Sequence, residues 1–167
     1  MARNHSFLPV SNADAHVLIL GSMPGRKSLE KQEYYALPQN VFWKIMGELV
    51  GAGPKSAYKE RLRLLKSSGI ALWDVLASCE RDGSSLDSRI KKEVANNFTA
   101  FFKKHPHITK VFFNGSKAEQ SFRKLVQANE KQTLPLLKFY RLPSTSPAHA
   151  GKRYTEKLHE WRAIINS

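Results

Sequence analysis

The side chains of this chain that could do chemistry are mostly small and neutral. Several stand at or near the ends of predicted strands: Asn40, Asp74, Asn114, Ser144, Ser146 and His149. A carboxylate only accepts hydrogen bonds, whereas a carboxamide both donates and accepts them. Groups of this kind can orient a ligand or a water molecule without acting as strong nucleophiles. The sequence therefore indicates a site that works by positioning its ligand.

Other kinds of chemistry lack their usual sequence signatures. The chain has no Walker loop, no G-x-G-x-x-G fingerprint and no serine in a nucleophile elbow. Its six histidines show no metal-ligand spacing with cysteine or carboxylate. Cys79 is the single cysteine, which rules out a disulfide within the chain and any site built only from cysteines. We expect no metal ion and no other cofactor.

Two small-residue loops each follow an apolar run, at residues 21–25 and 142–149. Glycine and serine leave room at such loops and expose backbone N–H groups, so a phosphate or a flat base can approach closely. Residues in these loops are therefore predicted to contact phosphate, namely Gly21, Ser22, Gly25, Ser144, Ser146 and His149. The net charge of +13 favours a nucleic acid as the partner.

The composition is that of a folded chain. Lys and Arg number 27 against 14 Asp and Glu, and they are spread over the whole length. The 167 residues suit one domain, residues 1–167, and we expect a monomer. No signal peptide or bilayer-length apolar run is evident, so we expect no membrane partner and a reducing, cytoplasmic location.

Apolar runs alternate with helical patterns along the sequence. Strands are predicted at 16–20, 70–73, 109–113 and 136–142, and helices at 41–50, 58–66, 95–104, 116–127 and 152–165. A polar loop is predicted at 78–88. This alternation predicts an α/β fold of three layers, with a mostly parallel four-stranded sheet and helices on both faces. Four strand ends then meet at one edge, where such sheets bind ligands: Gly21, Asp74, Asn114 and Ser144.

An aromatic segment at 34–43 surrounds Asn40, which precedes a predicted helix. Tyr35 and Phe42 are candidates to stack on a base. The alternative is that Phe42 and Trp43 belong to the core and that Asn40 only caps the helix.

Five segments together carry a resemblance. They are Gly-Ser-Met-Pro-Gly at 21–25, Tyr-Tyr-Ala-Leu-Pro-Gln-Asn-Val-Phe-Trp at 34–43, Leu-Trp-Asp-Val-Leu-Ala-Ser-Cys-Glu-Arg-Asp-Gly-Ser-Ser-Leu-Asp at 72–87, Phe-Phe-Asn-Gly at 112–115, and Leu-Pro-Ser-Thr-Ser-Pro-Ala at 142–148. In this order, over nearly the whole chain, they resemble the hypoxanthine-DNA glycosylases of the uracil-DNA glycosylase superfamily.

The resemblance implies a repair enzyme that flips a deaminated base out of damaged DNA and hydrolyses its N-glycosidic bond. In the wider superfamily an Asp or Asn in the first motif activates water, but Met23 stands there in this chain. The resemblance places that role on Asn40. Leu142 replaces the histidine that often begins the last motif, so efficient uracil excision is not expected.

Hypoxanthine presents an N1–H donor beside an O6 acceptor, and adenine presents the reverse pattern. Asp74 and Asn114 could supply the complementary acceptor and donor from neighbouring strand ends. Alternatively, Asp74 caps a helix or pairs with Arg81 or Arg89, and Asn114 serves the turn before Gly115.

Three other functions stay open at this point. They are a nucleic-acid-binding domain without catalysis, a uracil-DNA glycosylase of different base preference, and a doubly wound nucleotide enzyme. The last is weakened because the sequence lacks a phosphate-loop lysine and a metal-binding pair of carboxylates. None of the proposed catalytic segments, at Asn40, Asp74 and Asn114, contributes a lysine, so we expect a glycosylase without lyase activity.

Overall fold

The computed structural model describes residues 3–166. Its strands and helices follow in this order: β1 (Arg3–His5), β2 (Val17–Gly21), α1 (Arg26–Lys31), α2 (Phe42–Val50), α3 (Tyr58–Ser67), β3 (Ile70–Asp74), β4 (Leu76–Glu80), β5 (Lys91–Ala95), α4 (Phe98–Lys104), β6 (Lys110–Asn114), α5 (Ser116–Phe122), β7 (Lys138–Leu142) and α6 (Tyr154–Trp161). Short helical turns at Asp87–Arg89, Arg123–Gln127 and Arg162–Ile164 complete them.

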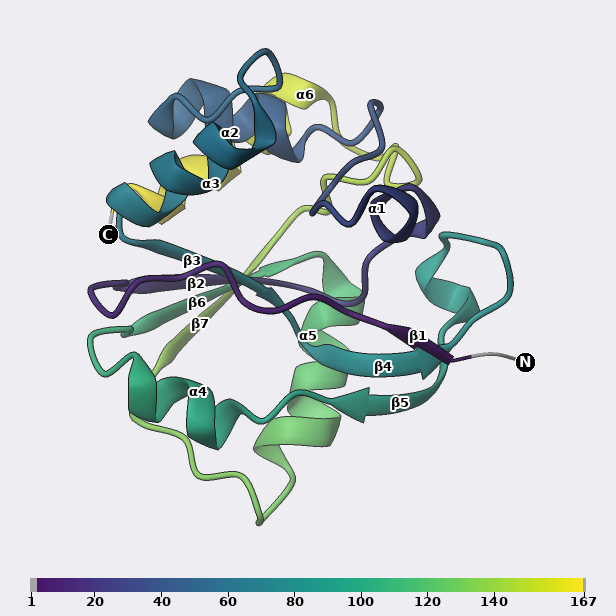
Figure 1. Cartoon of the computed structure of the whole chain (residues 1–167), viewed down its shortest axis with the longest axis vertical. Coiled ribbons are helices and arrows are strands. Elements are labelled where there is room, and N and C mark those ends of the chain that lie inside the picture. The colour runs from purple at the N-terminus through teal and green to yellow at the C-terminus, as the bar shows by residue number, and fades with distance from the viewer. Residues whose placement is uncertain (1–2, 167) are drawn as a thin grey trace.

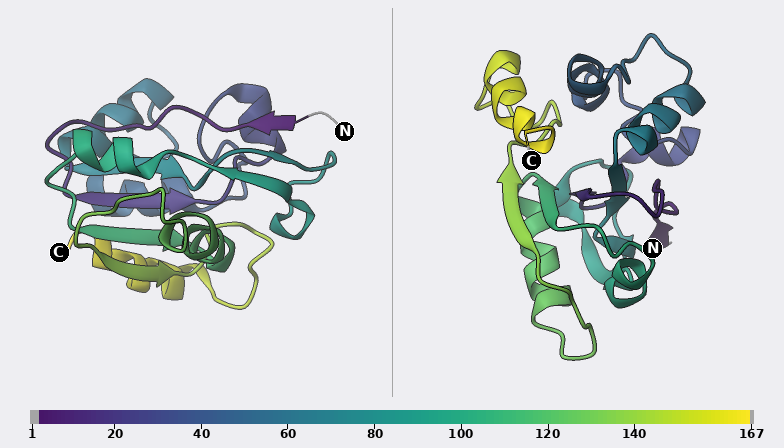
Figure 2. Two further views of the ribbon diagram at one scale, coloured as in Figure 1. Left: turned by 90° about the horizontal axis from the view of Figure 1, so that it is seen from below. Right: turned by 90° about the vertical axis from the view of Figure 1, so that its left-hand side faces the viewer.

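A parallel sheet in the order β3-β2-β6-β7 forms the middle layer. In Figure 1, α2, α3 and α6 lie above this sheet and α4 and α5 lie below it. The side views in Figure 2 show the same three layers. The predicted α/β class and sheet arrangement are confirmed.

The central strand β2 is buried over its whole length, as expected of a parallel strand covered on both faces. Because successive side chains alternate between the two faces, Val17 and Ile19 join the core beneath α2, α3 and α6. Leu18 and Leu20 join the opposite core, against α4 and α5. Both faces are thus fixed by apolar packing, and the carboxyl ends of the strands are held at one edge.

A second sheet was not predicted. Strands β1, β4 and β5 form an antiparallel sheet beside the main one. The predicted loop at 78–88 is wrong at its start, because β4 runs to Glu80. The predicted helix at 95–104 is wrong at its start, because Ala95 ends β5 and the Asn97 side chain caps α4 by accepting from Ala100 N at 3.1 Å. The Lys-Lys-Glu start of β5 lacks the apolar run that marks a buried strand.

Other boundaries differ by a few residues. The last strand begins at Lys138 rather than 136, and the C-terminal helix begins at Tyr154 rather than 152. Within residues 3–166, no helix combines the length and the apolar character needed to cross a membrane.

Candidate active site

A cavity of about 1160 Å³ opens at the carboxyl ends of the parallel strands. Every residue that the sequence predicted for the site lines it, with the exception of Phe42. Segments from five parts of the chain therefore meet here: the loop at 21–25, the turn at 35–40, the ends of β3 and β6, and the loop at 142–149. The rule that ligands bind at this edge of a parallel sheet predicted their meeting.

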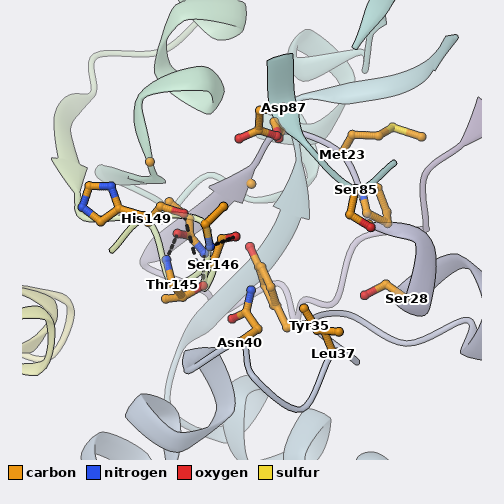
Figure 3. Close-up of a pocket in the computed structure, with 18 of the residues that line it drawn as sticks. Met23, Ser28, Tyr35, Leu37, Asn40, Ser85, Asp87, Thr145, Ser146 and His149 are labelled. Atoms are coloured by element: carbon orange, nitrogen blue, oxygen red, sulfur yellow. Dashed lines mark hydrogen bonds between the residues drawn. The ribbon is translucent and has the colours of Figure 1, made fainter. Parts of the chain in front are cut away.

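Phe42 lies in the core and not at the cavity wall. Its side chain is fully buried, and its ring stacks on Tyr35 with 4.1 Å between centroids and 22° between planes. Of these two candidates, Tyr35 is the one that borders the cavity, and Figure 3 shows its hydroxyl pointing inward. Its backbone has a φ of 52°, which is unusual for a bulky residue. The local backbone thus places Tyr35 over Phe42 at the wall of the cavity.

Asn40 lies beside Tyr35 and faces the same cavity (Figure 3). Its Oδ1 accepts a hydrogen bond from Phe42 N at 2.9 Å. The N-cap of α2 is Val41, and it has no side-chain cap, so Asn40 does not take the capping role considered as the alternative; it forms a turn contact with the first residue of the helix. This contact leaves Oδ1 able to form another hydrogen bond, because a carbonyl oxygen has two lone pairs and can accept a second hydrogen. The contact fixes the amide at the cavity wall.

Asp74 ends β3 directly opposite Gly21 in the register with β2. Its carboxyl group is buried, and Oδ2 has no hydrogen-bond partner within residues 3–166. Burial, reinforced by the nearby Asp87 carboxylate and opposed by Arg81, raises the pKa of Asp74 to about 7. The carboxyl group therefore changes charge near neutral pH.

Arg81 is buried below the 21–25 loop, where its Nη2 donates to the carbonyl oxygen of Pro24. Its Nε and Nη1 are buried without a partner among the described residues. No ion pair joins Asp74 to Arg81 or Arg89 in that part of the chain, and Arg89 lies 3.8 Å from Asp82 instead. The guanidinium acts on Asp74 as a neighbouring charge rather than as a direct partner.

Asn114 ends β6 and is paired with Thr145 of the last loop. Its Nδ2 donates to Thr145 Oγ1 at 2.9 Å, and its Oδ1 accepts from Thr145 N at 3.0 Å. Thr145 is buried, and its carbonyl oxygen accepts from Val41 N at 3.1 Å. One residue thus joins the end of β6, the last loop and the helix that follows Asn40. Both ends of the Asn114 amide already have partners in Thr145, and the base contact predicted for Asn114 stays a prediction.

The first small-residue loop is bound to residues 85–87, at the end of the 72–87 segment, for which the sequence predicted no role in the site. Ser22 Oγ donates to Asp87 Oδ1 at 2.7 Å, and Arg26 N donates to Ser85 Oγ at 2.8 Å. Ser85, Leu86 and Asp87 also line the cavity, and Figure 3 places Ser85 and Asp87 at its edge. The Ser22 hydroxyl is therefore engaged with a carboxylate, and the contact with phosphate predicted for it stays a prediction.

The last loop is shaped by its own side chains. Ser144 Oγ accepts from Ser146 N and Ser146 Oγ accepts from Ala148 N, both at 3.2 Å. Lys157 of α6 is buried beneath the loop, and its Nζ donates to the carbonyl oxygen of His149 at 2.8 Å. The His149 side chain itself is exposed. A positive charge thus lies under a loop whose outer side is open to a ligand.

Basic side chains stand around the cavity. Arg26, Lys27, Arg141 and Lys152 line it together with the acidic Glu30 and Glu160. Lys152 forms an ion pair with Glu160. A rim of this kind attracts phosphates on either side of a bound nucleotide.

Sequence reasoning gave no role in the site to Asp87, Ser85, Leu86 and Thr145. Their roles depend on contacts between distant parts of the chain, such as Ser22 with Asp87. The available signal was that all four lie in segments that carry the resemblance, 72–87 and 142–148.

Comparisons with known proteins show what this chain is similar to in sequence and in fold. The sequence model described as "Uracil DNA glycosylase superfamily" matches residues 8–167. A protein of Methanosarcina barkeri named hypoxanthine DNA glycosylase is 36% identical over 136 residues, covering 81% of this chain and 85% of that relative. A protein of Methanosarcina acetivorans with the same name is 34% identical over 161 residues, covering 95% and 96%. A solution NMR structure of a candidate uracil DNA glycosylase from Methanosarcina acetivorans is similar with a TM-score of 0.79 and 32% identity, covering 98% of this chain and 97% of that one.

Proposed function

The chain belongs to the uracil DNA glycosylase superfamily, and from this premise we propose that it is a DNA repair enzyme that excises hypoxanthine from DNA. The observation that carries the proposal is the convergence of Asn40, Tyr35 and Asp74 in one cavity, in a chain whose relatives bear the name hypoxanthine DNA glycosylase. We further propose that it acts as a single-domain monomer on damaged DNA.

The reaction replaces a bond from carbon to nitrogen with a bond from carbon to oxygen. A water molecule attacks C1′ of the deoxyribose, the bond between C1′ and N9 breaks, and its electron pair leaves with the base. One proton of the water ends on the released base or in solvent. The transition state carries positive charge on the sugar and negative charge on the base, so fixed dipoles can stabilise it.

Asn40 is the residue proposed to orient the attacking water. Its Oδ1 is already fixed by Phe42 N, and the second lone pair of Oδ1 can accept one hydrogen of the water. The flipped base lies against Tyr35, whose ring Phe42 supports from the core. The ionised carboxylate of Asp74, at the inner end of the cavity, accepts a hydrogen bond from N1–H of hypoxanthine.

The flanking phosphates lie against the two small-residue loops and the basic rim. The 21–25 loop lies on one side, where Tyr35 and Asp74 take the space beside Gly21 itself, and Ser144, Ser146 and His149 offer polar groups on the other. Backbone contacts of this kind fix the register of the DNA without reading its sequence.

The test is a base-release assay on duplexes that differ in one base. Hypoxanthine, uracil, xanthine and ethenoadenine are placed at one position, with adenine there as the control, and abasic sites are detected by alkaline cleavage. The fastest single-turnover release is expected for hypoxanthine. Binding without release of any base would support the alternative of a non-catalytic DNA-binding domain, and faster release of uracil would support a uracil-DNA glycosylase.

A further inference from the structure

Two buried polar atoms at the inner end of the cavity have no hydrogen-bond partner among residues 3–166. They are the phenolic oxygen of Tyr35 and Oδ2 of Asp74. Buried polar atoms in folded proteins are nearly always paired, because an unpaired one loses its hydration without compensation. Both residues line the cavity, so a bound ligand can supply the missing partners.

Gly21 shows that these two side chains converge. A Cβ atom placed on Gly21 would lie 2.7 Å from the Tyr35 oxygen and 2.6 Å from Asp74 Oδ1. Any residue larger than glycine would therefore collide with both polar groups. At Gly21 the backbone of β2 carries no side chain, and Tyr35 from the 35–40 turn and Asp74 from β3 both point into the space beside it.

The two groups differ in hydrogen-bonding character. Burial and the Asp74 carboxylate raise the pKa of Tyr35 far above its usual range, and the neighbouring Asn114 amide opposes this only in part. The phenol therefore keeps its proton and can donate. An ionised Asp74 only accepts. A donor beside an acceptor is the complement of the O6 acceptor and N1–H donor of hypoxanthine.

We infer that the Tyr35 hydroxyl donates a hydrogen bond to O6 of the flipped hypoxanthine while Asp74 accepts from its N1–H. Tyr35 then meets the edge of the base with its oxygen, and it takes the donor role that the sequence suggested for Asn114. The Asn114 amide is already held at both ends by Thr145. The inference rests on the proposed function, since it names the groups that read the base in that reaction.

The experiment combines one protein change with one substrate change. Tyr35→Phe keeps the ring that stacks on Phe42 and removes only the oxygen. Its matched control is Tyr140→Phe, because Tyr140 also stacks on a phenylalanine, Phe112, and lies outside the cavity. The substrates are duplexes with hypoxanthine or 6-thiohypoxanthine, in which sulfur, a weaker acceptor, replaces O6. Single-turnover release is measured for both, with affinity for an abasic-site duplex as the measure of DNA binding.

Tyr35→Phe is expected to slow release of hypoxanthine about 10- to 100-fold and to leave the affinity for the abasic duplex unchanged. Relative to hypoxanthine, 6-thiohypoxanthine should lose more rate with the wild type than with Tyr35→Phe, because only the wild type has the hydroxyl that distinguishes oxygen from sulfur. Tyr140→Phe should behave as the wild type.

Thermal unfolding supplies a readout that a structural role would not give. Since the Tyr35 oxygen has no partner in the described part of the free protein, Tyr35→Phe should leave Tm unchanged or raise it. A lowered Tm, a wild-type rate on hypoxanthine, or an unchanged effect of sulfur in Tyr35→Phe would overturn the inference. If the wild type itself releases no hypoxanthine, the proposed function fails, and that result is distinguishable because it precedes any comparison of variants.

Discussion

Asn114 and Thr145 hold each other by two hydrogen bonds that run in opposite directions, from Asn114 Nδ2 to Thr145 Oγ1 and from Thr145 N to Asn114 Oδ1. The pair joins the end of β6 to the loop proposed to meet phosphate. The position of that loop therefore depends on a side chain in the sheet, and the loop and the sheet edge act as one unit.

Asn114→Ala should accordingly weaken DNA binding and base release together. Loss of both hydrogen bonds leaves Thr145 N and Thr145 Oγ1 without these partners and loosens the loop, an effect of about 1–3 kcal/mol. Affinity for an abasic duplex and single-turnover release of hypoxanthine would both be measured. Thr145→Val is the matched variant, and the double variant should lose less than the sum of the two single changes. If Asn114→Ala slows release, keeps full affinity and has no counterpart in Thr145→Val, the amide reads the base instead.

Asn40→Ala should lower single-turnover release of hypoxanthine about 10²- to 10³-fold in a folded protein, because the attacking water loses its orienting group. The change also removes the hydrogen bond to Phe42 N at the start of α2. Asn97→Ala is the control, since the Asn97 side chain also accepts from a backbone N–H at the start of a helix, α4, on the opposite face of the sheet. Both variants should lose similar stability, and only Asn40→Ala should lose catalysis. Equal rates in the two variants would remove Asn40 from the mechanism.

Asp74→Asn should change base discrimination more than DNA affinity. An amide can turn its donor toward the N1 acceptor of adenine, so the preference for hypoxanthine should fall by about 1–3 kcal/mol. Single-turnover rates on hypoxanthine, uracil and adenine measure this, with the abasic duplex again reporting affinity. A variant that keeps the wild-type rates and their ranking would show that Asp74 is structural.

The stability of the protein should also respond to Asp74 as pH changes. The folded pKa of about 7 lies above the usual 3.8 of the free side chain, so the folded state binds this proton more tightly than the unfolded chain does. The associated stability is complete below pH 3.8 and is lost as pH rises to about 7. Asp74→Asn, which cannot ionise, should be more stable than the wild type by about 2–4 kcal/mol at pH 8, and by much less at pH 4. Denaturant unfolding at the two pH values provides the comparison, and equal differences at both would contradict the raised pKa.

Borohydride should trap no covalent complex between the protein and hypoxanthine-containing DNA. A lyase step needs an amine that is free to attack C1′, and both lysines that line the cavity have carboxylate partners, Lys152 with Glu160 and Lys27 with Glu30. Denaturing gels after borohydride treatment check this, with Lys152→Ala as the control for any adduct that forms. An adduct abolished by that change would mean that the enzyme has a lyase activity.

The main sheet could be predicted because its strands are short apolar runs that end at turn residues. The strand at 17–21 is the clearest, since every residue is buried. Strands β1 and β5 could not be predicted in the same way. They are short and polar, and they lie at the edges of a small sheet, where pairing with β4 rather than local pattern decides the structure.

The site was predicted as far as strand ends determine it. Gly21, Asp74 and Asn114 follow from the strands that carry them. The sequence could not decide between Tyr35 and Phe42, because both are aromatic residues of the same segment. The backbone turn at Tyr35 directs that side chain to the cavity, whereas Phe42 lies in the core. Asp87 was missed because it reaches the site only through its contact with Ser22.

The pairing of Gly21 with Asp74 across β2 and β3 has a consequence for how this protein can change over generations. A shift of the pairing by one residue would put another side chain beside the bare backbone, and it would also turn the apolar side chains of the shifted strand away from their core. The proposed reading of the base is thus protected by the same packing that folds the chain. New preferences among bases are accordingly easier to reach through the loops at the rim, where insertions are tolerated, than through the strands that carry these two residues.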